Sequence, residues 1–281
     1  MFEYKNVTDI PTVTLINTVN EIFKDYIVPV RWDINSFEKD SKEFSISLED
    51  SFIVYENQKP IGVSIISCRK DLGRIDSFGV KEEYRGKGIA SEMLYKTIEI
   101  LKWKGVKKIV LEVASMEERA IKFYEKHGFK IKRILESFHT DVPDNIPPKN
   151  TYTIEDPNWL KESSFLAKTN LKRITNWQRH PQTLYLSDQR YKIEKIKSWD
   201  YVDGYVVWGI NDDNTYIVDA APIVDVSKYD ELILDIKNKL SFYKNKIIVV
   251  AVPEDDPLNK ALKNNNFQVF LQQKEMQMKF H

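Results

Sequence analysis

Two segments in different halves of the chain match each other in the order and spacing of their residues. Lys108–Phe129 and Lys246–Phe267 align without a gap, so that an apolar run, a polar junction, a short helical pattern and a final phenylalanine coincide. Upstream, Arg74–Val80 corresponds to Thr215–Ala221, and each leads through a helix to its matched strand. A chance match of one strand and one helix would not extend to the preceding elements. We therefore interpret the two halves as copies of one fold.

Hydrophobic periodicity predicts mixed α/β structure in both halves. In the first half, it indicates helices over 15–26, 90–102 and 118–126, a hairpin over 51–66, and strands over 74–80 and 107–113. In the second half, it indicates strands over 204–210, 215–221 and 246–252 and helices over 229–240 and 257–265. The stretch 141–158 is rich in proline and poor in apolar residues, which is typical of a linker. We thus expect domains over 1–140 and 159–281.

The composition is that of a globular protein, with 42% hydrophobic and 30% charged residues. The 42 basic residues balance 42 acidic residues, which gives no support for a nucleic-acid binder. No apolar run approaches the ~18 residues of a transmembrane helix, and the first residues lack a signal-peptide pattern. A single cysteine, Cys68, fits a reducing compartment, so we expect a cytoplasmic protein. We expect it to be a monomer or a homodimer. The histidines have no metal-ligand spacing, so no metal site is expected.

The stretch "EEYRGKGIAS" (Glu82–Ser91) joins a predicted strand to a predicted helix. Its glycines allow positive φ and close approach of a ligand to the backbone. A helix that begins near Ile89 would direct free N–H groups and its positive dipole end toward the loop. Arg85 can add a charge-assisted contact. The stretch therefore predicts a phosphate site, with a basic surface turn as the alternative.

The second copy lacks these polar groups. It has Val250 where the first copy has Glu112, and Leu262 where the first has Tyr124. In place of the glycine loop it has "PIVDVSKYDE", which contains no glycine. Packing tolerates these replacements and catalysis does not, so the second copy is predicted to have lost any activity.

The segment from "SFGV" through "RGKGIA" and "LEV" to "AIKFYEKHGF" resembles the GNAT superfamily of acetyl-CoA-dependent N-acetyltransferases. The resemblance implies a tandem GNAT protein, in which each domain has a mixed, mostly antiparallel sheet flanked by helices and the C-terminal copy is degenerate. It also implies that coenzyme A contacts the glycine loop, the strand before it and the start of the short helix. The residues concerned are Phe78, Gly79, Val80, Arg85, Gly86, Lys87, Gly88, Ile89, Ala90 and Glu117. Glu117 departs from the pattern, because many relatives have asparagine there.

The resemblance assigns Tyr124 as the acid that gives its proton to the coenzyme A sulfur. A phenol suits this role because it is protonated at neutral pH. Glu112 is the first candidate for the general base and Asp76 the second; either carboxylate can instead be structural, and water can relay the proton.

The acceptor is expected to bind near residues 26–47, where Arg31, Trp32 and Glu38 either line the site or pack the loop. Two functions follow. The first is acetyl transfer from acetyl-CoA to a primary amine of a small molecule or peptide, by direct attack in a ternary complex. The alternative is an acyl-CoA sensor or partner-binding module without turnover.

Overall fold

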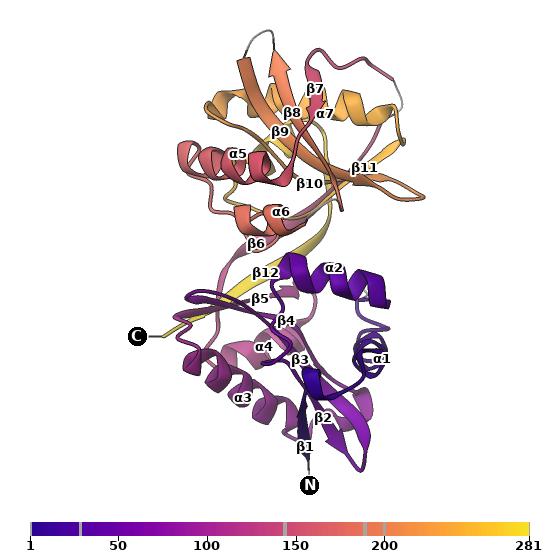
Figure 1. The fold of residues 1–281 in the computed structure, drawn as a ribbon, viewed down its shortest axis with the longest axis vertical. Coiled ribbons are helices and arrows are strands. Elements are labelled where there is room, and N and C mark those ends of the chain that lie inside the picture. The colour runs from indigo at the N-terminus through magenta and orange to yellow at the C-terminus, as the bar shows by residue number, and fades with distance from the viewer. Residues whose placement is uncertain (1, 28–29, 143–144, 188–189, 199–200, 281) are drawn as a thin grey trace. The chain divides into compact units, whose positions relative to one another are not determined.

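The computed structural model describes residues 2–27, 30–142, 145–187, 190–198 and 201–280. The chain divides into two compact units (Figure 1). Unit 1 comprises Met1–Lys132 with Lys274–His281, and unit 2 comprises Arg133–Gln273. The boundaries expected at residues 140 and 159 differ from this division, because strands β6 (Lys130–Asp141) and β12 (Gln268–Lys279) each contribute residues to both units.

Unit 1 is built on a mixed sheet with the strand order β1-β2-β3-β4-β5-β12. The pairs from β1 to β4 are antiparallel, and β4 and β5 are parallel. The remaining strands are β1 (Glu3–Asn6), β2 (Phe52–Glu56), β3 (Lys59–Arg69), β4 (Leu72–Val80) and β5 (Lys108–Ala114). The helices are α1 (Thr12–Ile22), α2 (Ile34–Phe44), α3 (Ile89–Trp103) and α4 (Glu118–Lys126).

Local sequence signals account for several of these boundaries. Asn57 and Gln58 have φ values of 48° and 64°, as a two-residue hairpin turn between β2 and β3 requires. Gly128 has φ 91° and ends α4. Helix α4 occupies the residues predicted for it, whereas α1 ends at Ile22, earlier than the predicted Tyr26.

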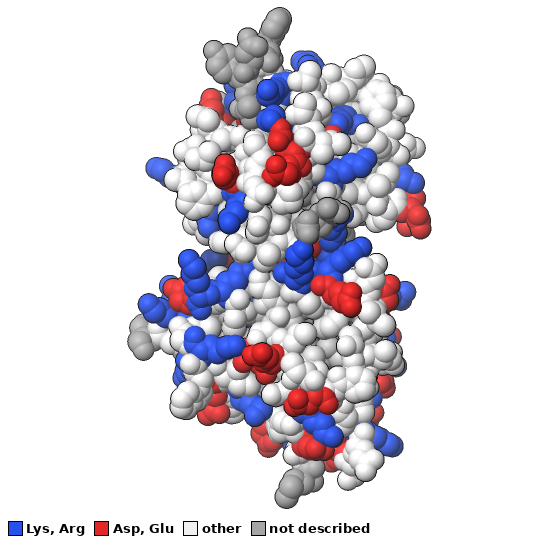
Figure 2. All heavy atoms as spheres, in the orientation of Figure 1, with Lys and Arg blue, Asp and Glu red and all other residues white. Residues whose placement is uncertain are grey.

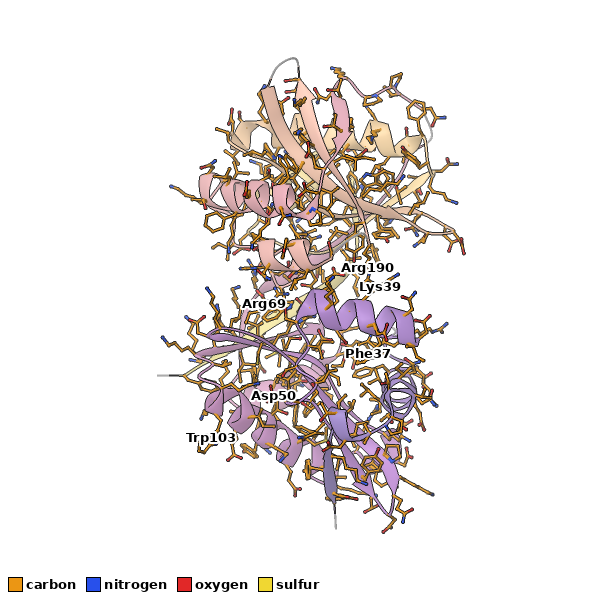
Figure 3. All side chains as sticks on the ribbon, viewed as in Figure 1. Phe37, Lys39, Asp50, Arg69, Trp103 and Arg190 are labelled. Atoms are coloured by element: carbon orange, nitrogen blue, oxygen red, sulfur yellow. The ribbon has the colours of Figure 1, made fainter. Side chains whose placement is uncertain are left out.

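Helices cover both faces of the unit 1 sheet. Helices α1 and α2 pack with β2 and β3 in one cluster, to which Leu15, Val19, Phe37, Ile53 and Val63 belong. Helices α3 and α4 pack on the opposite face in a second cluster, to which Leu94, Ile98, Leu111, Val113 and Ile121 belong. Figure 3 shows the amphipathic character of α2: Phe37 is buried, and Lys39 on the same helix is exposed.

Unit 2 contains strands in the order β6-β11-β10-β9-β8-β7, with the first part of β12 beside β6. Its other strands are β7 (Thr151–Ile154), β8 (Lys192–Ser198), β9 (Tyr201–Ile210), β10 (Thr215–Pro222) and β11 (Lys246–Pro253). Its helices are α5 (Pro157–Asn170), α6 (Pro181–Leu186), α7 (Tyr229–Ser241) and α8 (Pro257–Asn264). The segment predicted as a linker contains β7 and the start of α5, and its Pro143 and Asp144 lie outside the described residues.

The internal repeat is confirmed. The order β10-α7-β11-α8 repeats β4-α3-β5-α4, and β10 and β11 are parallel, as β4 and β5 are. The parallel pairing is short in both units. It covers Leu72–Arg74 in β4 and Thr215–Ile217 in β10.

A buried polar network joins the elements of unit 2. Asp219 on β10 is fully buried and pairs with the Arg173 guanidinium at 2.8 Å. The Tyr205 hydroxyl on β9 donates to Asp219 at 2.7 Å, and Arg173 also contacts Asp256 before α8 at 3.1 Å. Buried charges of this kind stabilise a fold only when every group is satisfied.

We predict that Tyr205→Phe lowers the free energy of unfolding by about 1–3 kcal/mol, because Asp219 loses a buried hydrogen-bond donor. Urea unfolding followed by circular dichroism measures the change. Tyr243→Phe is the matched control, because Tyr243 is 44% exposed. Equal losses in the two variants would contradict a stabilising role for the network.

Candidate active site

A β-bulge interrupts β4 in the middle of the sheet. Ser77 lies opposite Ile65 on β3 and Ile75 lies opposite Ile66, so Asp76 is the extra residue. A bulge bends its strand and increases the local twist. The parallel pairing of β4 with β5 ends at Arg74, just before this residue. The two strands, β4 and β5, therefore separate toward their C-terminal ends and leave an opening through the sheet.

A cavity of about 700 Å³ lies at this opening. The end of α1 and the turn after it, the last residues of β4, the glycine loop and α4 all contribute to its wall. Of the cofactor residues predicted from the sequence, all but Lys87 line it: Phe78, Gly79, Val80, Arg85, Gly86, Gly88, Ile89, Ala90 and Glu117. Tyr124 lines it as well. Residues far apart in the sequence are thus brought to one cavity.

Gly86, Gly88, Ile89 and Ala90 of the glycine loop line this cavity. Gly86 and Gly88 have φ values of 79° and 86°, a conformation that glycine adopts without strain. Among the described residues, no hydrogen-bond acceptor pairs with the backbone N–H groups of residues 86–90. Helix α3 begins at Ile89, so its positive dipole end adds to these donors. Such a cradle is suited to a phosphate or pyrophosphate group.

Two cations flank the loop in different ways. The Arg85 Nε donates to the carbonyl of Val80 at 3.0 Å, which fixes the side chain at the base of the loop. The Lys87 ammonium lies over the Tyr84 ring, 4.9 Å from its centroid. Both charges lie beside the unpaired N–H groups and favour an anion there.

Gly79 allows α1 to approach β4. A Cβ at this position would lie 2.5 Å from Ile22 Cγ2 and 3.3 Å from the Phe23 ring. Any larger residue would push the end of α1 outward. This glycine therefore sets the distance between β4 and the α1 side of the cavity.

Tyr124 reaches the cavity from α4. Its ring lies 6.2 Å from that of Phe78 and 5.6 Å from that of Phe129, and it is 7% exposed. Burial raises the pKa of Tyr124, and the nearby Tyr26 raises it further. Its hydroxyl makes no hydrogen bond to another described residue. Tyr124 is thus a protonated phenol that can donate to a ligand.

Asp76 and Glu112 lie on the face of the sheet that α1 and α2 cover, and neither lines the cavity. Both contact the buried guanidinium of Arg74, Asp76 at 2.9 Å and Glu112 at 3.7 Å. Burial raises the pKa of Asp76, and Arg74 opposes this shift. Phe44 from α2 covers Arg74, with the guanidinium carbon 5.5 Å from its ring centroid. The structure thus places both candidate bases in an ion-pair cluster beside the opening.

Of the residues named in the expected acceptor segment 26–47, Arg31, Trp32 and Glu38 do not line the cavity. The Trp32 indole donates to Asp40 at 2.8 Å and stacks on Phe37, so Trp32 is a packing residue. Arg31 and Glu38 are exposed and do not line the cavity, and Val28 and Pro29 lie outside the described residues. Tyr26, the first residue of the expected segment, lines it. The Ala114 N–H of β5 donates to the Tyr26 hydroxyl, a long-range contact that the sequence does not indicate.

Unit 2 has a bulge at the corresponding position. In β10, Val218 is the extra residue, since Ile217 lies opposite Trp208 and Asp219 opposite Val207. The Arg179 guanidinium lies 3.7 Å from Asp219 on β10, and donates to the carbonyls of Val250 and Ala251 on β11 at 2.6 and 2.8 Å. Arg179 is 1% exposed. A buried arginine therefore bridges the strands at the position that corresponds to the unit 1 opening.

Other chemistry finds less support in the described part of the chain. No group of three or more His, Cys, Asp or Glu side chains there is arranged to hold a metal ion. Burial raises the pKa of Cys68 to about 11, which keeps it a thiol. Figure 2 shows acidic and basic side chains mixed over the visible face of unit 1. None of the helices in the described ranges is both long and apolar enough to cross a membrane.

Residues 16–129 match the model of the acetyltransferase (GNAT) family. The N-alpha-acetyltransferase 30 of Schizosaccharomyces pombe is 35% identical over 94 residues, which cover 31% of this chain and 61% of that protein. An N-alpha-acetyltransferase of Saccharolobus solfataricus is 37% identical over 26% of this chain and 44% of its own length. The chain thus spans less than two thirds of either relative.

The whole fold also has solved counterparts. A tandem GNAT protein from the clavulanic acid biosynthesis pathway matches with a TM-score of 0.69 and 11% identity, over 99% of this chain and 98% of that one. At this identity the likeness concerns the fold, and it extends over both units. The family match, in contrast, falls on the segment that forms the cavity. Residues 16–129 are thus similar to the GNAT acetyltransferases, and the chain as a whole has the fold of a tandem GNAT protein.

Proposed function

We propose that unit 1 binds acetyl-CoA and transfers its acetyl group to a primary amine of a small molecule or peptide, by direct attack in a ternary complex in the cytoplasm. The observation that carries this proposal is one cavity lined both by residues 86 and 88–90, whose N–H groups have no acceptor among the described residues, and by Tyr124. The cradle suits the pyrophosphate of coenzyme A, and the phenol suits its sulfur. The family match to this segment supports the same reaction.

Acetyl-CoA, when bound, supplies a thioester carbonyl as the electrophile. Residues 86–90 hold its pyrophosphate, and Phe78 to Val80 offer backbone groups along β4. Tyr124 holds on its hydroxyl oxygen the proton that the departing thiolate needs, and its raised pKa keeps that proton in place at neutral pH. The amine must be neutral to attack. A peptide α-amine, with a pKa of about 7.7–8.0, is the acceptor to test first, because a lysine amine at about 10.4 is far more protonated.

We expect one coenzyme A site per chain, because Arg179 bridges the corresponding strands of unit 2. Isothermal calorimetry with coenzyme A measures the stoichiometry. In Gly88→Ala the affinity should fall at least tenfold, because a Cβ at φ 86° strains the cradle. Gly105→Ala is the matched control, since Gly105 has φ 77° and equally open space, but lies beyond the far end of α3. Two sites per chain, or equal losses in both variants, would contradict the assignment.

Tyr124→Phe should lower kcat roughly a hundredfold and leave the Kd for acetyl-CoA within about twofold, because only the proton donor is removed. Steady-state kinetics with short peptides that carry a free α-amino group measure kcat, and calorimetry measures Kd. Tyr95→Phe on the exposed surface of α3 should match the wild type. Tight acetyl-CoA binding without turnover by the wild type on any amine would instead identify an acyl-CoA sensor.

Glu112 remains our first candidate for the general base and Asp76 our second. Because Glu112 lies outside the cavity wall, it would act through a bridging water or hydroxyl group. Glu112→Gln should then remove the acidic limb of the pH–rate profile and lower kcat/KM about a hundredfold at neutral pH. Glu118→Gln, an exposed residue of α4 paired with Lys122, is the control. A profile that keeps its acidic limb would exclude Glu112 as the base. The same measurement on Asp76→Asn would then test whether Asp76 is the base.

A further inference from the structure

The end of α3 in unit 1 presents a tryptophan to solvent. Trp103 is the last residue of this helix, and its side chain is 91% exposed. Among the described residues it is the most exposed of the large apolar side chains. Figure 3 shows it at the outer surface of unit 1. Because the ring packs against so little of its own domain, it is available for an apolar contact with a partner.

Lysines from three parts of the chain lie at this end of unit 1. Those close to Trp103 in the sequence are joined by one from β6 and one from β12: Lys102, Lys104, Lys107, Lys108, Lys132 and Lys279. Phe280, which follows β12, lies against the end of α3. Its ring centroid is 4.8 Å from the Lys102 ammonium, and its N–H donates to the carbonyl of Lys107 at 2.9 Å. We call Trp103 and these lysines the α3-end patch.

Carboxylates neutralise only part of the charge of this patch. Lys104 pairs with Asp50, and Lys132 pairs with the buried Glu275 at 2.9 Å. The other lysines of the patch form no ion pair with another described residue: Lys102, Lys107, Lys108 and Lys279. All of these but Lys108 are exposed. The patch therefore carries a net positive charge on a surface that a partner can reach.

The positive charges of the patch also repel one another. Burial lowers the pKa of Lys108, and the charge of Lys132 lowers it further. Lys279 acts in the same direction, while Glu275 and Asp71 oppose these effects. The dipole of α3 favours cations near its C-terminal end, but it does not account for the lysines that come from β6 and β12. An anion bound to the patch would relieve this repulsion.

An exposed indole among lysines is suited to an anionic phospholipid surface. Tryptophan is enriched at the headgroup level of membranes, and clusters of roughly four to eight basic residues bind acidic headgroups. Single-stranded nucleic acid, in contrast, stacks successive bases on several aromatic rings. Phe280 is partly buried and packs against the cluster of α3 and α4, so Trp103 is the ring of this patch that a ligand can reach. The patch therefore fits a lipid surface better than a nucleic acid.

We propose that the α3-end patch binds the surface of a membrane that contains anionic phospholipids. The indole lies at the level of the headgroups, and the lysines contact their phosphates and carboxylates. Helix α3 has 15 residues, which places the patch about 20 Å from the glycine loop at the other end of the helix. A bilayer at the patch thus leaves the loop free. This inference goes beyond the proposed acetyl transfer and does not depend on it.

Co-sedimentation of the full chain with lipid vesicles tests this proposal. Vesicles of phosphatidylcholine with about one third phosphatidylserine should bind the protein about tenfold or more tightly than vesicles of phosphatidylcholine alone. Binding should also weaken about tenfold or more when the salt is raised from about 0.1 M to about 1 M, because the Debye length shortens from roughly 10 Å to roughly 3 Å. Equal binding to both kinds of vesicle, or binding to neither, would overturn the proposal.

Two variants test the patch itself. The triple variant Lys102→Gln, Lys107→Gln and Lys279→Gln should bind the acidic vesicles roughly 100-fold more weakly, at about fivefold for each lysine. Trp103→Ala should weaken binding about tenfold, because the indole no longer enters the interface. All of these residues are exposed, so thermal unfolding followed by circular dichroism should match that of the wild type.

Matched variants remove the same groups elsewhere on the surface. Lys59, Lys122 and Lys228 are exposed and lie outside the patch, and their joint replacement by Gln lowers the net charge by the same amount. This variant should bind the acidic vesicles within about threefold of the wild type. Ile154→Ala is the control for Trp103→Ala, since Ile154 is 81% exposed on β7. It should bind as the wild type does.

A loss of vesicle binding that is confined to the patch variants supports the proposal. Equal losses in the two triple variants would show that net charge alone drives the binding, and would overturn it. Binding of a single-stranded oligonucleotide by a protein that ignores acidic vesicles would also overturn it, because the partner would then be a nucleic acid. Acetyl transfer is measured separately by kinetics, so its failure would leave the membrane proposal standing.

Discussion

The β-bulge at Asp76 is the constraint on which the site in unit 1 depends. Without the extra residue, β4 would continue its parallel pairing with β5 past Arg74, and the sheet would be closed. The bulge instead separates the strands and leaves an opening through the sheet. Because α1 and α2 cover one face and α3 and α4 the other, that opening is reached from two sides.

The glycines around the opening serve different physical purposes. Gly79 lacks a side chain because the end of α1 lies against it. Gly86 and Gly88 adopt positive φ in the loop that lines the cavity. The first glycine shapes the α1 side, and the other two shape the anion site. Each would be strained or crowded as any other residue.

Unit 2 shows that this architecture does not by itself make a site. Its β10 carries the same bulge, and its β10 and β11 pair over an equally short stretch. Arg179 then bridges the separating strands through Asp219 and the carbonyls of β11, and Arg173 and Tyr205 complete a buried network. The polar groups that would otherwise face a ligand satisfy one another. In the second copy, internal hydrogen bonds thus occupy the position that corresponds to the unit 1 opening.

Elements with strong local signals followed from the sequence. The period of α4 and its terminal Gly128, the hairpin at Asn57 and the repeat itself depend on neighbouring residues, and the structure has them where predicted. The segments that were not assigned, including α2, β7 and β12, have weaker patterns. Whether a polar or proline-rich stretch forms a strand or helix depends on partners distant in the chain.

The sequence by itself determined that the chain has two related domains and that its first half carries a glycine loop and Tyr124. The resemblance of its first half to a known family also predicted which residues would face the cofactor. Only the tertiary structure decided that Asp76 and Glu112 share Arg74, that Tyr26 reaches Ala114, and that Arg179 bridges β10 and β11. Each of these contacts joins residues far apart in the chain, and such pairings leave no periodic signal in the sequence.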